Sequence, residues 1–243
     1  MSRVADENGH MRTRLLRIAA VTASVMLGLV ACAPASPSAE VSTPTPADGP
    51  VVSFYGDSYT RGTGASSSDR RWSTVISVDR GWHEINRSEN GLGFVNRRAG
   101  MRDGLDDIPA LVIADRPDIV FVTMGLNDNF SYDDRADEIR STIDSDLQRL
   151  RDGLPAARIV VVEPFWYIAD RPASVDVISG WVEDAAARIG ADHIDGASRW
   201  LDGHYADDPD SWMAGDGLHP NDTGYAHMAE RMDAALRALD PPL

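Results

Sequence analysis

Short apolar runs alternate with helical stripes of apolar residues along the chain from residue 51 to residue 243. Runs of this kind, rich in Val and Ile, are typical of parallel strands that are covered on both faces. The pattern predicts strands at residues 51–55, 82–85, 118–124, 158–162 and 193–194. A chain that repeats strand and helix in this way is expected to fold as a layered α/β domain.

Three stripes of apolar residues, spaced by three or four positions, predict amphipathic helices between and after these strands. The first stripe consists of Ala136, Ile139, Ile143, Leu147 and Leu150, the second of Val175, Ile178, Val182, Ala185 and Ile189, and the third of Tyr225, Met228, Met232, Leu236 and Leu239. A glycine or proline ends each helix, at Gly153, Gly190 and Pro241. We therefore expect a doubly wound parallel sheet, in which ligands bind beyond the carboxyl ends of the strands.

An excess of acidic residues limits the partners that the chain can have. It contains 38 Asp and Glu against 23 Lys and Arg, which gives a formal net charge of −15 at pH 7. This balance argues against nucleic acid as a partner, because a phosphate-binding surface needs positive patches. Hydrophobic residues make up 43 % of the chain, enough to form a core and to exclude a wholly disordered protein. The single cysteine, Cys32, excludes a disulfide framework and a zinc site built from cysteines.

The N-terminal residues have the pattern of an export signal. Arg12, Arg14 and Arg17 precede an uncharged run of 13 residues, 18–30. This run is too short to span a hydrocarbon layer of ~30 Å comfortably, but it suits the apolar region of a signal peptide. It ends at the sequence LVAC, residues 29–32, which resembles the lipobox of bacterial lipoproteins.

The lipobox resemblance implies that a peptidase cuts before Cys32 and that its thiol takes a diacylglyceryl group. We therefore expect an exported chain that is anchored by lipid to the outer face of the bacterial cell membrane. Its expected parts are a signal peptide at 1–31, a tether at 32–50 and a folded domain at 51–243. Residues 33–50 are Pro, Ala, Ser or Thr at 14 of 18 positions, as in an extended tether. The alternative is an ordinary secretory signal that is cut near Ala33, and the true start is either Met1 or Met11.

Three polar motifs carry the chemistry, and two of them directly follow predicted strands. They are Gly56-Asp57-Ser58-Tyr59, Gly125-Leu126-Asn127-Asp128 and, before the last helix, Asp216-Gly217-Leu218-His219-Pro220. In this order they resemble the SGNH/GDSL hydrolase family of GDSL-like esterases and lipases, and the resemblance covers residues 51–243. It implies a three-layer α/β/α domain with a flavodoxin-like, doubly wound parallel sheet of five strands. It also implies a serine esterase that needs no metal and no organic cofactor. One departure is Tyr59, where the family often has Leu.

A serine hydroxyl becomes a good nucleophile only when a base takes its proton. Of the five histidines that follow the predicted signal peptide, only His219 has a carboxylate, Asp216, three residues upstream. That spacing lets Asp216 hold the far ring nitrogen, as a Ser-His-Asp catalyst requires. We therefore predict the triad Ser58, His219 and Asp216, with His204, which lies in a loop, as the rival base.

The family resemblance also implies an oxyanion hole and two supporting acids. Its donors are the Ser58 N–H, a glycine N–H after the second strand and the side chain of Asn127. Gly91 fits the family's spacing after Asn86, and Gly93 is the alternative. The resemblance gives Asp57 and Asp128 a structural role, in which their carboxylates bind backbone N–H groups.

The predicted function is the hydrolysis of carboxylic esters, acyl or acetyl, through an acyl-serine intermediate at the cell surface. The substrate is a small molecule or a glycan ester, and the membrane contact is the lipid on Cys32. An acyltransferase or a polysaccharide O-deacetylase would use the same three residues. A non-catalytic surface lipoprotein that binds a ligand is a further alternative, because a fold does not determine a function.

Overall fold

The computed structural model describes residues 49–99 and 107–243. A parallel sheet of five strands has the order β2-β1-β3-β4-β5. The strands are β1 (Val51–Gly56), β2 (His83–Asn86), β3 (Ile119–Thr123), β4 (Arg158–Val162) and β5 (Asp192–Ile194). All five agree with the predicted strands within two residues, and the order is that of flavodoxin-like sheets, so the predicted fold class is confirmed.

Side chains of the central strands alternate between the two faces of the sheet, as the pleat requires. On β1, Phe54 belongs to one buried cluster and Tyr55 to the other. The register pairs Phe54 with Phe121 of β3, and their rings stack with centroids 5.0 Å apart. Both faces are therefore apolar, which explains the unbroken runs in the sequence.

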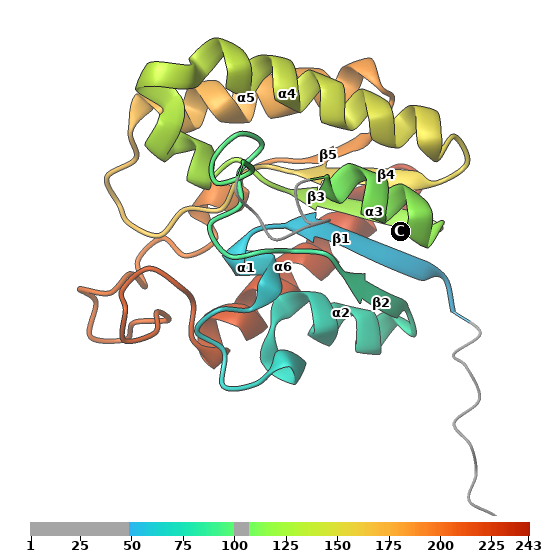
Figure 1. Ribbon diagram of the computed structural model, residues 1–243. Helices are drawn as coiled ribbons and strands as arrows, with labels where there is room; N and C mark the ends of the chain where they lie inside the picture. Colours follow the sequence, from blue (N-terminus) through green and yellow to red (C-terminus); the bar gives the residue numbers. More distant parts are fainter. Residues whose placement is uncertain (1–48, 100–106) are drawn as a thin grey trace, which may run out of the picture. The chain divides into compact units, whose positions relative to one another are not determined.

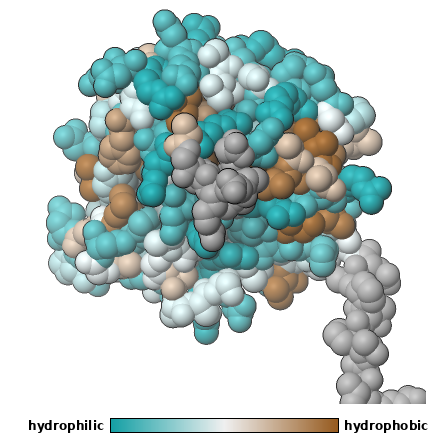
Figure 2. Space-filling model, in the orientation of Figure 1, coloured by the Kyte–Doolittle hydropathy of each residue, from teal (hydrophilic) through white to brown (hydrophobic). Residues whose placement is uncertain are grey.

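Helices cover both faces of the sheet (Figure 1). Helices α2 (Trp72–Arg80) and α6 (Asp222–Ala238) pack on one face, and α3 (Ile108–Asp115), α4 (Tyr132–Gly153) and α5 (Ala173–Arg188) pack on the other. One-turn helix α1 (Ser58–Arg61) follows β1 directly, and the 3-10 turns are η1 (Ser68–Arg70), η2 (Asn127–Ser131) and η3 (Ala197–Arg199). Hydrophilic residues cover most of the face that Figure 2 shows.

The three predicted helices are confirmed as α4, α5 and α6, whose apolar stripes face the core. Helices α2 and α3 were not predicted from the sequence. In α2 the core-facing positions include Ser73 and Ser77, whose hydroxyls bind Glu84 and the Ser73 carbonyl. Six of the eight residues of α3 are apolar, so no stripe distinguishes a buried face.

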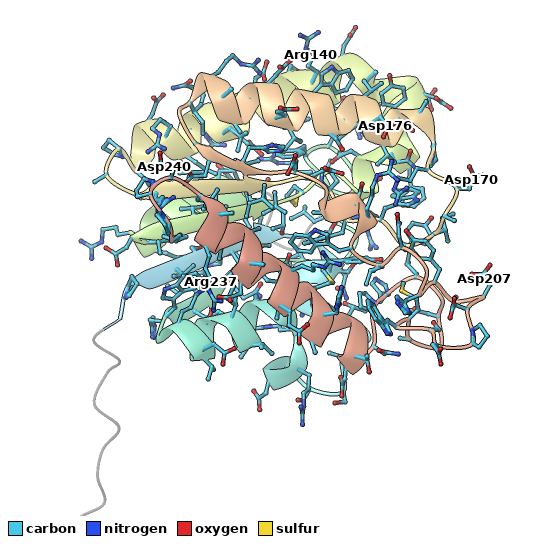
Figure 3. All side chains as sticks on the ribbon, turned by 180° about the vertical axis from the view of Figure 1, so that it is seen from behind. Arg140, Asp170, Asp176, Asp207, Arg237 and Asp240 are labelled. Carbon is cyan, nitrogen blue, oxygen red and sulfur yellow. The ribbon has the colours of Figure 1, made fainter. Side chains whose placement is uncertain are left out.

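Seen from behind, α6 lies across the sheet, with Arg237 in its last turn and Asp240 just beyond it (Figure 3). Asp170 and Asp207 project from the loops after β4 and β5 at the opposite end of the domain. The carboxyl ends of the strands lie at that end, and the three motifs meet there.

The predicted signal peptide, Cys32 and the tether up to residue 48 lie outside the described residues. The domain boundaries and the lipid anchor therefore stay predictions. Within residues 49–99 and 107–243, no helix has the length and apolar character needed to cross a membrane.

Candidate active site

Ser58 is the first residue of α1, and only Asp57 separates it from the end of β1. Asp57 caps this helix, because its Oδ1 accepts the N–H of Tyr59 at 2.9 Å. Gly62 ends the helix with a φ of 90°, a left-handed conformation that glycine adopts without strain. The short helix thus holds the Ser58 backbone at the carboxyl edge of the sheet.

Ser58, His219 and Asp216 form one hydrogen-bonded chain. The Nε2 of His219 lies 2.9 Å from the Ser58 Oγ, although the two residues are 161 positions apart. The Nδ1 of His219 lies 2.7 Å from the Asp216 Oδ2. The structure therefore brings together the three residues that the sequence analysis singled out.

Asp216 holds the backbone of its own loop as well as the imidazole. Its Oδ1 accepts the N–H groups of Leu218 and His219, each at 3.0 Å. Partial burial opposes ionisation, but the hydrogen bonds from His219 and from the two backbone groups prevail and lower the pKa of Asp216 to about 2. The carboxylate is therefore charged throughout the neutral range.

The loop that carries Asp216 and His219 is fastened to the start of α6. Met213 and Pro220 form an antiparallel bridge, and the N–H of Ala214 donates to the His219 carbonyl at 2.7 Å. Asn221 caps α6, because its Oδ1 accepts the N–H groups of residues 223 and 224. The His-Pro-Asn sequence thus ends the loop and begins the helix.

His204, the rival base, does not contact Ser58. Its ring stacks on Trp212 with centroids 3.5 Å apart, and its Nδ1 lies 3.3 Å from the Asp210 carbonyl oxygen. Among the described residues, the histidine that reaches the Ser58 hydroxyl is His219.

Asn127 is the first residue of the η2 turn, which follows β3. Its Nδ2 donates to the Leu92 carbonyl at 3.0 Å and to the Asp57 Oδ2 at 3.3 Å. The second bond is the longer and weaker of the two. The amide therefore lies between the first motif and the loop after β2.

Asp57 and Asp128 are buried, and both accept hydrogen bonds from backbone N–H groups. The Asp128 carboxylate accepts the N–H groups of Phe94, Val95 and Asn96 at 2.7, 2.8 and 3.1 Å. Burial raises the pKa of Asp128 in spite of these bonds. Burial likewise raises the pKa of Asp57 to about 7, against the opposing effect of the Tyr59 N–H.

The two glycines that compete as oxyanion donors have different surroundings. Gly91 lines the same cavity as Ser58, Asn127 and His219. The N–H of Gly93 donates to the Asn96 carbonyl at 3.0 Å, and a Cβ on Gly93 would lie 2.5 Å from the Asp128 Oδ1. The geometry therefore favours Gly91 as the donor, and Gly93 is the residue that lets Asp128 approach the backbone.

A cavity of about 220 Å³ opens beside the Ser58 hydroxyl. It is lined by Ser58, Tyr59, Thr63, Asn90, Gly91, Arg97, Leu126, Asn127, Phe130, Leu218 and His219. Four of these residues lie outside the three motifs and were not predicted from the sequence: Thr63, Asn90, Arg97 and Phe130. Only the folding of the loops after β1, β2 and β3 brings these side chains to the cavity.

Residues 54–227 match the model of the GDSL-like lipase/acylhydrolase family. The chain belongs to this family. The match covers all three motifs, so this GDSL-family chain is a hydrolase of the esterase or lipase type. No curated protein matches the sequence.

Solved structures of low sequence identity share the fold of this GDSL-family chain. TesA is 21% identical, with a TM-score of 0.61 over 79% of this chain and 99% of its own. The psychrotrophic esterase EstA from Pseudoalteromonas sp., inhibited by monoethylphosphonate, is 14% identical, with a TM-score of 0.59 over 77% of this chain and 97% of its own. The salicylyl-acyltransferase SsfX3 from a tetracycline biosynthetic pathway is 21% identical, with a TM-score of 0.57 over 79% of this chain and 55% of its own.

Residues suited to a metal ion are not gathered in the part of this hydrolase that the structure describes. No group of three or more His, Cys, Asp or Glu side chains there is arranged to hold one. The polar groups beside the cavity include the Ser58 hydroxyl, the His219 imidazole and the Asn127 amide, which are suited to acyl transfer.

Proposed function

We propose that the chain is a serine esterase that cleaves carboxylic esters through an acyl-serine intermediate. The observation that carries this proposal is the hydrogen-bonded chain from the Ser58 Oγ through His219 to Asp216, with separations of 2.9 and 2.7 Å. In such a chain the imidazole accepts the serine proton, and the carboxylate stabilises the imidazolium that forms. Ser58, His219 and Asp216 are therefore the proposed catalytic residues.

Acylation begins when the His219 Nε2 takes the Ser58 proton and the Oγ attacks the ester carbonyl carbon. The carbonyl electron pair moves onto oxygen, and a tetrahedral intermediate forms. Its collapse expels the alcohol, which takes the proton from His219, and leaves the acyl group on Ser58. Water then repeats the sequence on the acyl-serine, with His219 again as base and acid, and releases the carboxylic acid.

The oxyanion is proposed to be bound by the N–H groups of Ser58 and Gly91 and by the Asn127 amide. In the structure one Asn127 N–H points to the Asp57 Oδ2 at 3.3 Å. This weak bond is the one that the amide would exchange for the developing negative charge. Asp57 and Asp128 are proposed to position the donors through the backbone groups that they bind.

The substrates are proposed to be acyl or acetyl esters of a small molecule or a glycan outside the cell. The support for this location comes from the sequence alone, where the basic and apolar residues before Cys32 and the Pro-rich tether have the pattern of a lipoprotein. Acyl transfer to a second alcohol would use the same acyl-serine. The fold neighbour SsfX3, named as an acyltransferase, keeps that alternative open.

Labelling with a fluorophosphonate probe tests the proposed function. The wild-type chain should react, with the label on Ser58, and should hydrolyse para-nitrophenyl butyrate. Ser58→Ala should lose both properties, and His219→Ala should lose nearly all esterase activity. His204→Ala serves as the matched histidine control and should keep its activity. Loss of activity in His204→Ala but not in His219→Ala would contradict the proposed triad, and an unlabelled wild type would contradict the proposed chemistry.

A further inference from the structure

We propose that Arg97 makes this enzyme select esters that carry a negative charge, a carboxylate or a phosphate, close to the scissile bond. The inference rests on the proposed esterase function and names the substrate class of that same site. Arg97 belongs to none of the three motifs, and the loop after β2 brings it to the cavity.

Arg97 lies against the proposed oxyanion hole. A Cβ built on Gly91 would lie 2.8 Å from the Arg97 Cδ and 3.0 Å from its Nη1. The guanidinium group is therefore beside the backbone that is proposed to bind the oxyanion. An ester bound with its carbonyl at Ser58 would present its neighbouring groups to Arg97.

The charge of Arg97 is not neutralised by the described residues. Its guanidinium group forms neither an ion pair nor a hydrogen bond with them, whereas nearby Arg61, Arg98 and Arg135 are paired with Glu89, Asp146 and Glu138. No carboxylate lines the cavity, so Arg97 provides its only permanently charged group among the described residues. In a chain of net charge −15, a cation beside the nucleophile that the described residues leave unpaired marks a place for an anion.

The backbone at Arg97 is in an unfavourable conformation. Its φ is +53°, in the left-handed region that residues with a Cβ rarely adopt. The preceding residues, 94–96, are held by the Asp128 carboxylate, which accepts all three of their N–H groups. Strained residues that the surrounding structure maintains cluster at binding and active sites.

The chemistry of the cavity fits an anionic ester better than a purely apolar one. A guanidinium group donates parallel hydrogen bonds to two oxygens of a carboxylate or phosphate. Leu126, Leu218 and the largely exposed Phe130 offer apolar contacts to the rest of the substrate. The site thus combines a nucleophile, a local positive charge and an apolar wall.

Matched esters test the proposal and separate the possible positions of the charge. On the alcohol side, the butyrate esters of para-hydroxybenzoate and para-hydroxyphenyl phosphate are compared with that of the neutral para-hydroxybenzamide. On the acyl side, para-nitrophenyl adipate is compared with para-nitrophenyl heptanoate. The readout is the ratio of kcat/KM for the anionic ester to kcat/KM for its neutral partner, measured with the full-length chain.

We expect this ratio to exceed 1 for at least one of the three pairs of esters. In Arg97→Gln it should fall about tenfold, mainly because the KM for the anionic ester rises. Arg97→Lys should keep part of the preference, since a point charge remains without the planar fork. Arg116→Gln is the matched control, because Arg116 is also exposed, has a φ of +49° and lies outside the cavity. Its ratio should equal that of the wild type.

An unchanged ratio in Arg97→Gln would overturn the inference, as would a wild type that hydrolyses only the neutral esters. In both cases the esterase function itself would stand, because the neutral esters report it separately. A wild type that hydrolyses no ester and takes no fluorophosphonate label would overturn the proposed function and this inference together.

Discussion

The hydroxyl group of Tyr59 donates a hydrogen bond of 2.7 Å to the carbonyl oxygen of Leu218, the residue before His219. This bond joins the helix of the proposed nucleophile to the loop of the proposed base, across 159 positions of sequence. The Tyr59 ring also stacks on Phe165, with centroids 5.7 Å apart. Tyr59 stands where the family often has Leu, so in this chain a hydrogen bond that leucine cannot form joins the elements that carry the proposed nucleophile and the proposed base.

Replacing Tyr59 with Phe removes this bond and keeps the ring. We expect kcat to fall roughly five- to tenfold with little change in KM, because a buried hydrogen bond contributes about 1 kcal/mol and here positions the base. Steady-state kinetics with a neutral ester measure this effect. Tyr55→Phe is the control, since its hydroxyl binds Asp146 at 2.8 Å within the other buried cluster. Equal losses of kcat in the two variants would show that Tyr59 has no special role.

Asn127→Ala should lower kcat by roughly 10²–10³ while KM changes little, because an oxyanion donor acts mainly on the transition state. The fluorophosphonate label should still form on Ser58, more slowly. A nearly normal kcat in this variant would show that Asn127 does not bind the oxyanion and only holds Leu92 and Asp57 through its amide. In a serine adduct, the oxyanion oxygen should lie roughly 2.7–3.1 Å from the N–H nitrogen of Gly91 and not of Gly93.

Asp216→Asn should lower kcat by roughly 10³–10⁴ at neutral pH, because an amide stabilises the wrong imidazole tautomer. Since the pKa of Asp216 is about 2, its carboxylate is ionised at every pH above about 4. A fall in the kcat/KM of the wild type between pH 7 and pH 5 therefore does not come from protonation of Asp216. The pKa of Asp216 is lower in the folded than in the unfolded chain, so its contribution to stability is present above about pH 4 and is lost as the pH falls towards 2. Kinetics and urea unfolding as functions of pH measure both effects.

Asp57→Asn should become progressively more stable relative to the wild type as the pH rises from about 4 to about 7. The pKa of Asp57 is about 7 in the folded chain and near 3.8 when unperturbed, so the unfolded chain loses this proton first. The free energy of unfolding of the wild type therefore falls as the pH rises from about 4 to about 7, by an amount on the order of 4 kcal/mol for a fully buried group. Urea unfolding of both proteins at several pH values checks the prediction. A difference in free energy of unfolding that stays constant with pH would refute it.

Cys32→Ser should block processing of the signal peptide or leave the chain without lipid. The lipobox pattern makes Cys32 the expected site of the diacylglyceryl group, and stable anchoring requires more than one acyl chain. Metabolic labelling with a fatty acid and fractionation of cells compare the variant with the wild type. Identical labelling of the two proteins would mean that Cys32 is not the lipidated residue.

Most of the fold could be predicted from the sequence because buried strands and helices have characteristic patterns of apolar residues. The runs at β3 and β4 are apolar at nearly every position, since both faces of the sheet are covered, and the stripes of α4, α5 and α6 repeat with the helical turn. The two helices that lack a clear apolar stripe, α2 and α3, were not predicted. Helix α2 turns Ser73 and Ser77 inward, and α3 is apolar on almost every side.

The sequence by itself determined which residue types are available for catalysis and that Ser58 and Asn127 follow strands of one parallel sheet. Asp216 and His219 are three positions apart, so their contact is local and readable from the spacing. The tertiary structure alone decided the partners of distant residues. It placed His219 rather than His204 against Ser58. It also placed Gly91 at the cavity and Gly93 against the Asp128 carboxylate, and it brought Arg97 to the cavity. Contacts of this kind depend on strand order, register and loop conformation, which arise from the packing of the whole domain and leave no local pattern in the chain.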